Sequence, residues 1–235
     1  MRKIKKFLCL VVAMVLICTY NLPAAAAAAF PEQQAGQSIS RAMAYFHRVQ
    51  NPDGGFSVQA GRSSNATLTS WVVLAITAAG ENAGGSSWAP QGNSPVDFLR
   101  GSKTTGETND YARLLLALSA AGQGPVHQDV DLAARIASLQ QANGQFAQFD
   151  IGERGFINSH VWSILALASA GQPIPQADKA RQWLLSRQND DGGFGWIEGM
   201  ASDADDTAVA IQALVVMGEE PAGSAAIGRA LQYLK

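Results

Sequence analysis

The sequence has little cysteine and little charge. Only two of its 235 residues are cysteines, Cys9 and Cys18, and both lie in the first eighteen positions. The rest of the chain therefore has no disulfide and no thiolate ligand for zinc. Its 17 lysines and arginines against 19 acidic residues give a formal net charge of -2, which excludes a basic surface for nucleic acid. We expect no nucleic-acid partner, no metal and no cofactor.

The first thirty residues are typical of a secretory signal peptide. Four basic residues lie within the first six positions, an apolar run follows from Phe7 to Cys18, and alanines fill positions 24–29. A basic start, a short apolar core and an Ala-x-Ala end mark such a signal, and this core is too short for a membrane span. We expect residues 1–29 to be removed. The mature protein would be secreted or at the cell surface, with no integral membrane span.

Residues 30–235 consist of one unit repeated. Four segments end in a short apolar run closed by a glycine: Gly80, Gly122, Gly171 and Gly218. A glycine just after an apolar run is typical of a helix end, and a helix that is apolar on nearly every side must be buried. The units run over about 38–80, 94–122, 130–171 and 176–218, with a partial fifth unit at 224–235.

Each unit begins with a helix of a different kind. Residues 38–49 and 176–187 both place apolar side chains on one face and basic side chains elsewhere. Stacked helix pairs, with the one-sided helices outside and the apolar helices inside, satisfy this pattern. The sequence thus predicts an all-α domain over 30–235.

Two stretches carry a resemblance to a known family. They are Arg41-Ala42-x2-Tyr45-Phe46-x3-Gln50-x3-Gly54-x-Phe56 and Lys179-Ala180-x2-Trp183-Leu184-x3-Gln188-x3-Gly192-x-Phe194. Both resemble the QW repeat of the squalene cyclases, with phenylalanine in place of the last tryptophan. The resemblance implies an α/α toroid of the terpenoid cyclase and protein prenyltransferase type. About four and a half helix pairs are present, so the toroid is expected to be incomplete or open. The protein prenyltransferases use a zinc site that includes a cysteine, which excludes their activity here.

Three aspartates precede the fourth apolar helix. The segment Asp203-Ala204-Asp205-Asp206-Thr207-Ala208 resembles the DxDDTA motif of squalene–hopene cyclase. The resemblance implies that Asp205 is a general acid and that Asp203 and Asp206 tune it, because neighbouring carboxylates raise one another's pKa. Aromatic faces would then stabilise carbocations. The candidates for that role are Trp71, Trp162 and Trp196.

Asp205 also has a structural interpretation. When the four units are aligned on their closing glycines, its position holds Thr67, Asn109 and Asn158 in the other copies. All four are good N-cap residues, so a helix cap explains the position without catalysis. The helix dipole would lower the pKa of a carboxyl group there, which opposes proton donation. A third interpretation is a calcium site, with Asp203, Asp205 and Glu198 as ligands but no recognised loop spacing.

Two further polar residues fall on otherwise apolar helices. His160 lies just inside a helix start, where we expect a polar first-turn residue; the alternative is a ligand contact or a catalytic role. Arg113 shares its position with Trp71 and Trp162. It is expected to pair with Asp110 three residues earlier, or else to face the inside of the toroid and contact an anion.

Three functions remain open. The favoured interpretation is an exported, non-enzymatic module that binds a small apolar ligand or a cell-surface partner, because one incomplete arc cannot exclude water from a carbocation. The alternative is a class II terpene cyclase, an isomerase, that acts through Asp205. A carbohydrate-active barrel would need two carboxylates on separate loops, for which the candidates are Glu107, Glu153 and Glu198.

Overall fold

The computed structural model describes residues 32–149 and 155–235. The expected signal peptide and Glu153 lie outside this part of the chain. Apart from its repeats, the chain as a whole divides into two compact units, Met1–Ala42 and Met43–Lys235. Helix α2 (Glu32–Val49) crosses the boundary, and every other element belongs to the second unit. The prediction of an all-α fold is confirmed.

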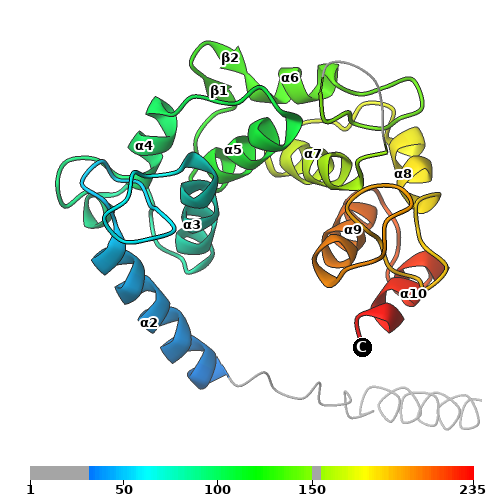
Figure 1. Cartoon of the computed structure of the whole chain (residues 1–235), viewed down its shortest axis with the longest axis horizontal. Coiled ribbons are helices and arrows are strands. Elements are labelled where there is room, and N and C mark those ends of the chain that lie inside the picture. The colour runs from blue at the N-terminus through cyan, green and yellow to red at the C-terminus, as the bar shows by residue number, and fades with distance from the viewer. Residues whose placement is uncertain (1–31, 150–154) are drawn as a thin grey trace, which may run out of the picture. The chain divides into compact units, whose positions relative to one another are not determined.

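Four helices form an inner row in the second unit: α3 (Ala66–Ala78), α5 (Thr108–Ala120), α7 (Ile157–Ser169) and α9 (Ala204–Val216). Each packs against the next, α3 on α5, α5 on α7 and α7 on α9. The outer elements alternate with them in the chain: α4 (Pro95–Gly101), α6 (Leu132–Ser138), α8 (Ala177–Leu185) and α10 (Ala225–Tyr233). Figure 1 shows this succession. The expected pairing of one-sided outer helices with apolar inner helices is confirmed.

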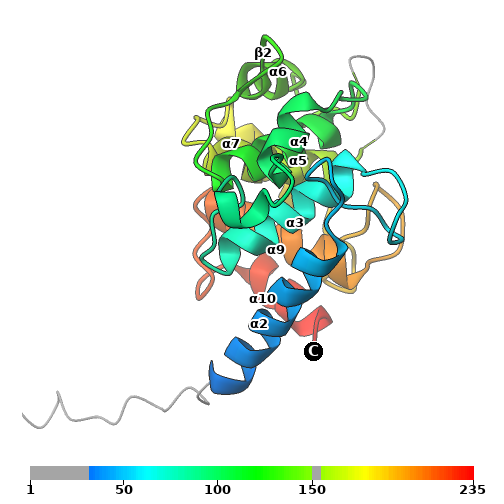
Figure 2. The same cartoon turned by 90° about the vertical axis from the view of Figure 1, so that its left-hand side faces the viewer.

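The inner helices end in the same way, which explains the periodic glycines. Gly80 has a φ of 83°, a left-handed conformation that glycine adopts without strain. Its N–H donates to the carbonyl of Thr77, and the next N–H, that of Glu81, donates to the carbonyl of Ile76. These two bonds form a Schellman motif, and Gly122, Gly171 and Gly218 repeat it. In Figure 2 the turns after α3 and α9 lie on one side of the row and the loops before these helices on the other.

The glutamine of the repeat motif links neighbouring units. The side-chain amide of Gln140 donates to the carbonyls of Gly144, in its own turn, and of Pro175, just before the next outer helix α8, over 3.1 and 2.6 Å. Gln188 makes the same pair of bonds, to Gly192 and to Ala226 of α10, both 2.8 Å. Gln50 again bonds its turn and the carbonyl of Trp88. Trp88 ends a short 3-10 helix, η1 (Ser86–Trp88), that precedes α4. Each glutamine therefore attaches its own turn to the segment that leads into, or begins, the next outer helix.

A two-residue hairpin, absent from the prediction, precedes α6. Strand β1 (Val126–His127) pairs antiparallel with β2 (Val130–Asp131). Its turn residues Gln128 and Asp129 both have positive φ, as a type I′ turn requires. Its strands are too short for the alternation that predicts a strand. Within the described residues no helix is long and apolar enough to cross a membrane.

Candidate functional site

The N-terminus of α9 is capped by Asp203. Its carboxylate accepts a hydrogen bond from the backbone N–H of Asp206 over 2.8 Å, and its backbone is extended. The N–H of Asp203 also donates to the carbonyl of Phe194, which fixes the loop ahead of the helix. These bonds start the helix at Ala204, two residues before the start that an N-cap at Asp205 would give.

The interpretation of Asp205 as the N-cap is therefore wrong. Asp205 is the second helical residue, and its side chain is exposed. The same shift applies to the other units, whose cap positions are Asn65, Glu107 and Phe156. Of these four residues, Asn65 and Asp203 cap the helix with their side chains, whereas the side chains of Glu107 and Phe156 make no capping bond. Alignment of the units on their closing glycines thus located the correct turn of the helix but assigned the N-cap to the wrong residue.

The residues aligned with Asp205 have another role, as a polar ladder across the row. The side-chain amide of Asn109, on α5, donates to the amide oxygen of Asn158, on α7, over 3.0 Å. The amide of Asn158 in turn donates to the carboxylate of Asp206, on α9, over 2.9 Å. These bonds join the first turns of three inner helices and show that the helices run parallel and in register.

Asp206 is the buried aspartate of the motif. It is 8% exposed, whereas Asp203 and Asp205 are exposed. Burial raises the pKa of Asp206 to about 6, and the hydrogen bond from Asn158 acts in the opposite direction. Asp203 and the charge of Asp205 add to the rise. The buried carboxyl group whose pKa is raised is thus that of Asp206, the last aspartate of the motif.

Two tryptophans meet on the inner face of the row. The ring centroids of Trp71, on α3, and Trp162, on α7, are 5.1 Å apart, with an edge-to-face angle of 65°. Both helices are neighbours of α5, which lies between them. Side chains of two helices separated by a third can touch only if the row curves toward them, so this face is concave. Trp71 is still 38% exposed, so a ligand could reach it.

Arg113 connects this aromatic pair to a polar pocket. Its guanidinium donates to the carboxylate of Asp110 over 2.7 Å and to the hydroxyl of Thr67 over 3.1 Å. The expected pairing of Arg113 with Asp110 is confirmed. The guanidinium carbon also lies 6.0 Å from the centre of the Trp71 ring, within cation–π range.

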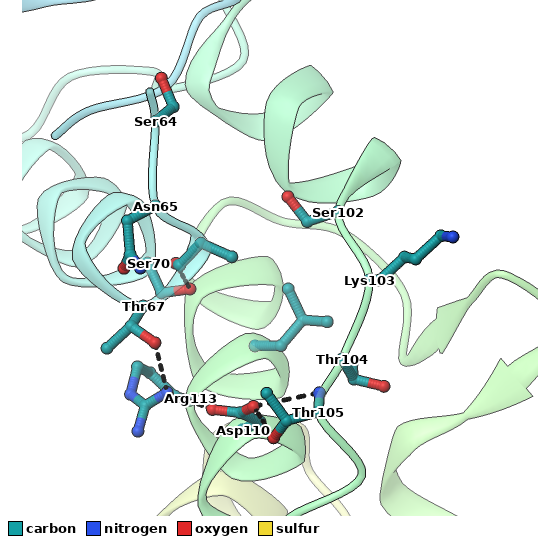
Figure 3. A pocket seen from close by; sticks show the side chains of 12 residues that line it. Ser64, Asn65, Thr67, Ser70, Ser102, Lys103, Thr104, Thr105, Asp110 and Arg113 are labelled. Carbon is teal, nitrogen blue, oxygen red and sulfur yellow. Dashed lines mark hydrogen bonds and ion pairs between the residues drawn. The ribbon is translucent and has the colours of Figure 1, made fainter. Parts of the chain in front are cut away.

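The pocket has a volume of about 250 Å³ and lies between the start of α3 and the segment 102–105. Figure 3 shows hydroxyl groups on both walls, among them Ser70 and Ser102, with the Arg113–Asp110 pair at one end. Thr105 holds the other side of the Asp110 carboxylate. Hydrogen bonds and the ion pair lower the pKa of Asp110 despite its partial burial. The pocket is therefore polar but close to neutral at its Arg113 end.

Comparison with known proteins agrees with this architecture. The model of the prenyltransferase alpha-alpha toroid domain matches residues 5–94 and 89–234. The chain belongs to this family. The drimenyl diphosphate synthase of Streptantibioticus cattleyicolor is 31% identical to it over 208 residues, an alignment that covers 79% of this chain and 37% of the synthase. The chain thus spans little more than a third of the length of that relative, and its toroid domain is of the prenyltransferase and terpenoid cyclase type.

The toroid domain does not bring all predicted site residues together. Trp196, on the loop before α9, is 49% exposed and packs its ring against Phe156 at 5.4 Å, apart from the Trp71–Trp162 pair. His160 is fully buried, with both ring nitrogens hydrogen-bonded, so it faces no ligand. Its position inside the first turn is as expected, but its burial is not.

The carboxylates considered for calcium binding and for carbohydrate chemistry are engaged separately. Glu198 pairs with Arg187 at 3.2 Å, and Glu107 accepts a hydrogen bond from Gln148 at 2.9 Å. In the described part of the toroid domain, no three acidic, histidine or cysteine side chains are placed to hold a metal ion.

Sequence reasoning missed Asn109 and Asn158 as a connected pair, and it missed the pocket. The aligned column had singled out both asparagines, but alignment alone does not reveal that parallel neighbours bond through it. The pocket depends on the segment 102–105. There the second unit has Gly101-Ser102-Lys103 in place of the glycine-rich turn of the other units, so the repeat gives no pattern to follow.

Proposed function

We propose that the chain is an exported, non-enzymatic module that binds an apolar ligand with a polar end group on the concave face of its inner helices. The contact between Trp71 and Trp162 carries the proposal, because it places two large aromatic faces on a curved, accessible surface. Aromatic side chains at such positions dominate binding energies. The family and its relative favour an isoprenoid chain as the apolar part.

The polar end of the ligand is assigned to the pocket beside Arg113. Arg113 touches both regions, since it contacts the Trp71 ring and also lines the pocket. A ligand that lies on the tryptophans with a hydroxyl group in the pocket would satisfy both surfaces. Farnesol, an acyclic isoprenoid alcohol, is the simplest probe with this chemistry.

Calorimetric titration with farnesol tests this function. Replacing Trp71 or Trp162 by alanine should weaken binding about tenfold or more, which corresponds to roughly 1.4 kcal/mol. Trp196→Ala is the matched control, because Trp196 is also an exposed, edge-to-face aromatic but lies outside the pair. A Trp196 variant that loses as much affinity as the other two would contradict the proposed site.

Acid-catalysed cyclisation is the second candidate. It is favoured by the raised pKa of Asp206 and by the relative's description as a synthase. The exposure of Asp205 opposes it, because a general acid for an alkene needs a dry, enclosed site. Incubation with farnesyl diphosphate and mass spectrometry of the products decides the matter. We expect no cyclic product; a product that disappears in Asp205→Asn would establish the enzyme instead.

A further inference from the structure

The inner helices bury equivalent positions, which identifies the side that each turns toward the next helix. The fifth and eighth residues of α3, α5 and α7 are all buried. They are Ser70 and Val73, Ala112 and Leu115, and Val161 and Ile164. The equivalent residues of α9, Ala208 and Ile211, are only partly buried. The row therefore has a forward side, and on α9 it is uncovered.

The uncovered side of α9 is apolar along its whole length. Ala204, Ala208, Ile211 and Val215 follow at intervals of four, three and four residues, so they lie on one face of the helix. Ala204 and Val215 are exposed, and no residue of this α9 stripe is fully buried. The stripe is at least as apolar as its buried counterparts, so its exposure does not come from a polar sequence. It has the composition of a buried helix contact. Ile211 touches the edge of the hydrophobic core, but among the described residues no further inner helix follows α9 to cover the stripe.

The α3 end of the row has the surface that would complement the α9 stripe. The tenth residue of α5, α7 and α9 is a fully buried alanine: Ala117, Ala166 and Ala213. On α3 the same position, Ala75, is only partly buried. Leu68, the third residue of α3, is also partly buried, as is its counterpart Asp110 on α5, while Ser159 on α7 and Asp206 on α9 are buried. Leu68 and Ala75 form an α3 stripe on the backward side of α3. On α5, α7 and α9 the same side packs against the preceding inner helix.

We propose that the α9 stripe of one copy packs against the α3 stripe of a second copy, head to tail. The contact would continue an interface that the chain already forms three times, between α3 and α5, α5 and α7, and α7 and α9. Both halves of this interface are present on one chain, at opposite ends of the inner row. Such an interface joins different surfaces of identical molecules, and it generates rings or longer chains of copies.

The register of the contact follows from the polar ladder. Asn158, the second residue of α7, bonds to Asp206, the third residue of α9, over 2.9 Å. On α3 of a second copy the equivalent of Asp206 is Leu68, and the equivalent of Asn158 in its bond with Asn109 is Thr67, so Asp205 of α9 would face this first turn. A glutamate at position 68 would then face Asp205, and two carboxylates at this distance repel each other.

Sedimentation velocity of the purified protein over a range of concentrations tests the contact. The wild type should form species larger than the monomer, and Ile211→Glu should shift them to monomer because it places a charge in the α9 stripe. Val216→Glu is the matched control. Val216 follows the stripe directly, at a position exposed in all four inner helices, so this variant should associate like the wild type.

Mixing two variants distinguishes a head-to-tail contact from a symmetric one. Leu68→Glu should also be monomeric, but it retains an intact α9 stripe, while Ile211→Glu retains an intact α3 stripe. Their mixture should therefore form dimers and nothing larger, which also shows that both variants are folded. A wild type that is monomeric at every concentration, an assembly that neither variant disrupts, or a mixture that stays monomeric overturns the proposal.

Discussion

Nδ1 of His160 accepts a hydrogen bond from the backbone N–H of Phe146 over 3.1 Å. In two other units a threonine does the same: Thr69 accepts from Phe56 and Thr207 from Phe194, both at 2.9 Å. His160 is therefore a larger version of a structural acceptor that fixes the turn phenylalanine. Its other nitrogen, Nε2, is placed to donate to the carbonyl of Ala180 in the outer helix α8, a bond that threonine cannot make.

Replacing His160 by threonine should lower the free energy of unfolding at neutral pH. It should also make that free energy less sensitive to a fall in pH. The buried ring packs against Trp183 at 4.6 Å, and its loss should cost on the order of 3 kcal/mol. Burial lowers the pKa of His160 to about 3, so the folded protein excludes a proton that the unfolded chain binds below about pH 6.5. The wild type should therefore lose stability as the pH falls below that value.

Thermal unfolding between about pH 7 and pH 5 measures the effect. The melting temperature of the wild type should fall more steeply than that of His160→Thr over this range. Equal slopes for the two proteins would mean that the imidazole is not held neutral by burial.

The architecture could be predicted because it depends on short, repeated signals. The apolar runs closed by Gly80, Gly122, Gly171 and Gly218 identify four inner helices without knowledge of their packing. The cap could not be placed, because several polar residues before α9 are all suitable and only the bond that the N–H of Asp203 donates to the carbonyl of Phe194 selects Asp203. The Trp71–Trp162 contact depends on the curvature of the row, which no local pattern records. The burial of His160 likewise depends on a distant helix, α8.

Asp203 and Asp205 should differ in their contributions to stability. Asp203→Ala removes the cap of α9 and should cost about 1 kcal/mol. Asp205→Ala removes an exposed first-turn carboxylate and should cost less than half as much. Chemical denaturation with urea measures both, and a larger loss for Asp205 would contradict the observed helix start.

Replacing Asp206 by asparagine should stabilise the protein at neutral pH. The pKa of Asp206 is raised above its ordinary value, so the folded state binds a proton more tightly than the unfolded chain between about pH 4 and pH 6. Its contribution is present in acid and lost as the pH rises through about 6. An asparagine can still accept the bond from Asn158 without the charge.

The melting temperature of Asp206→Asn should therefore exceed that of the wild type by a few degrees at about pH 7 and match it near pH 4. An advantage that is the same at both pH values would show that the gain is not electrostatic.

Gln140→Ala should weaken the link between the third and fourth units. The variant loses two hydrogen bonds to backbone carbonyls, worth about 2 kcal/mol together. Gln172→Ala is the control, because Gln172 is exposed and its amide makes a single long contact of 3.5 Å. Equal melting temperatures for the two variants would contradict the role assigned to Gln140.

The glutamine links also determine how the molecule comes apart. Each glutamine joins a unit only to the one that follows. No single bond spans the row, so local unfolding propagates between adjacent units. The last outer helix of the described chain, α10, is attached on one side alone, through Gln188 and through the hydroxyl of Tyr233, which donates to the carbonyl of Ser202. Amide hydrogens should exchange fastest at this end of the row and slowest in α5 and α7, so that unfolding begins at the edge and advances one unit at a time.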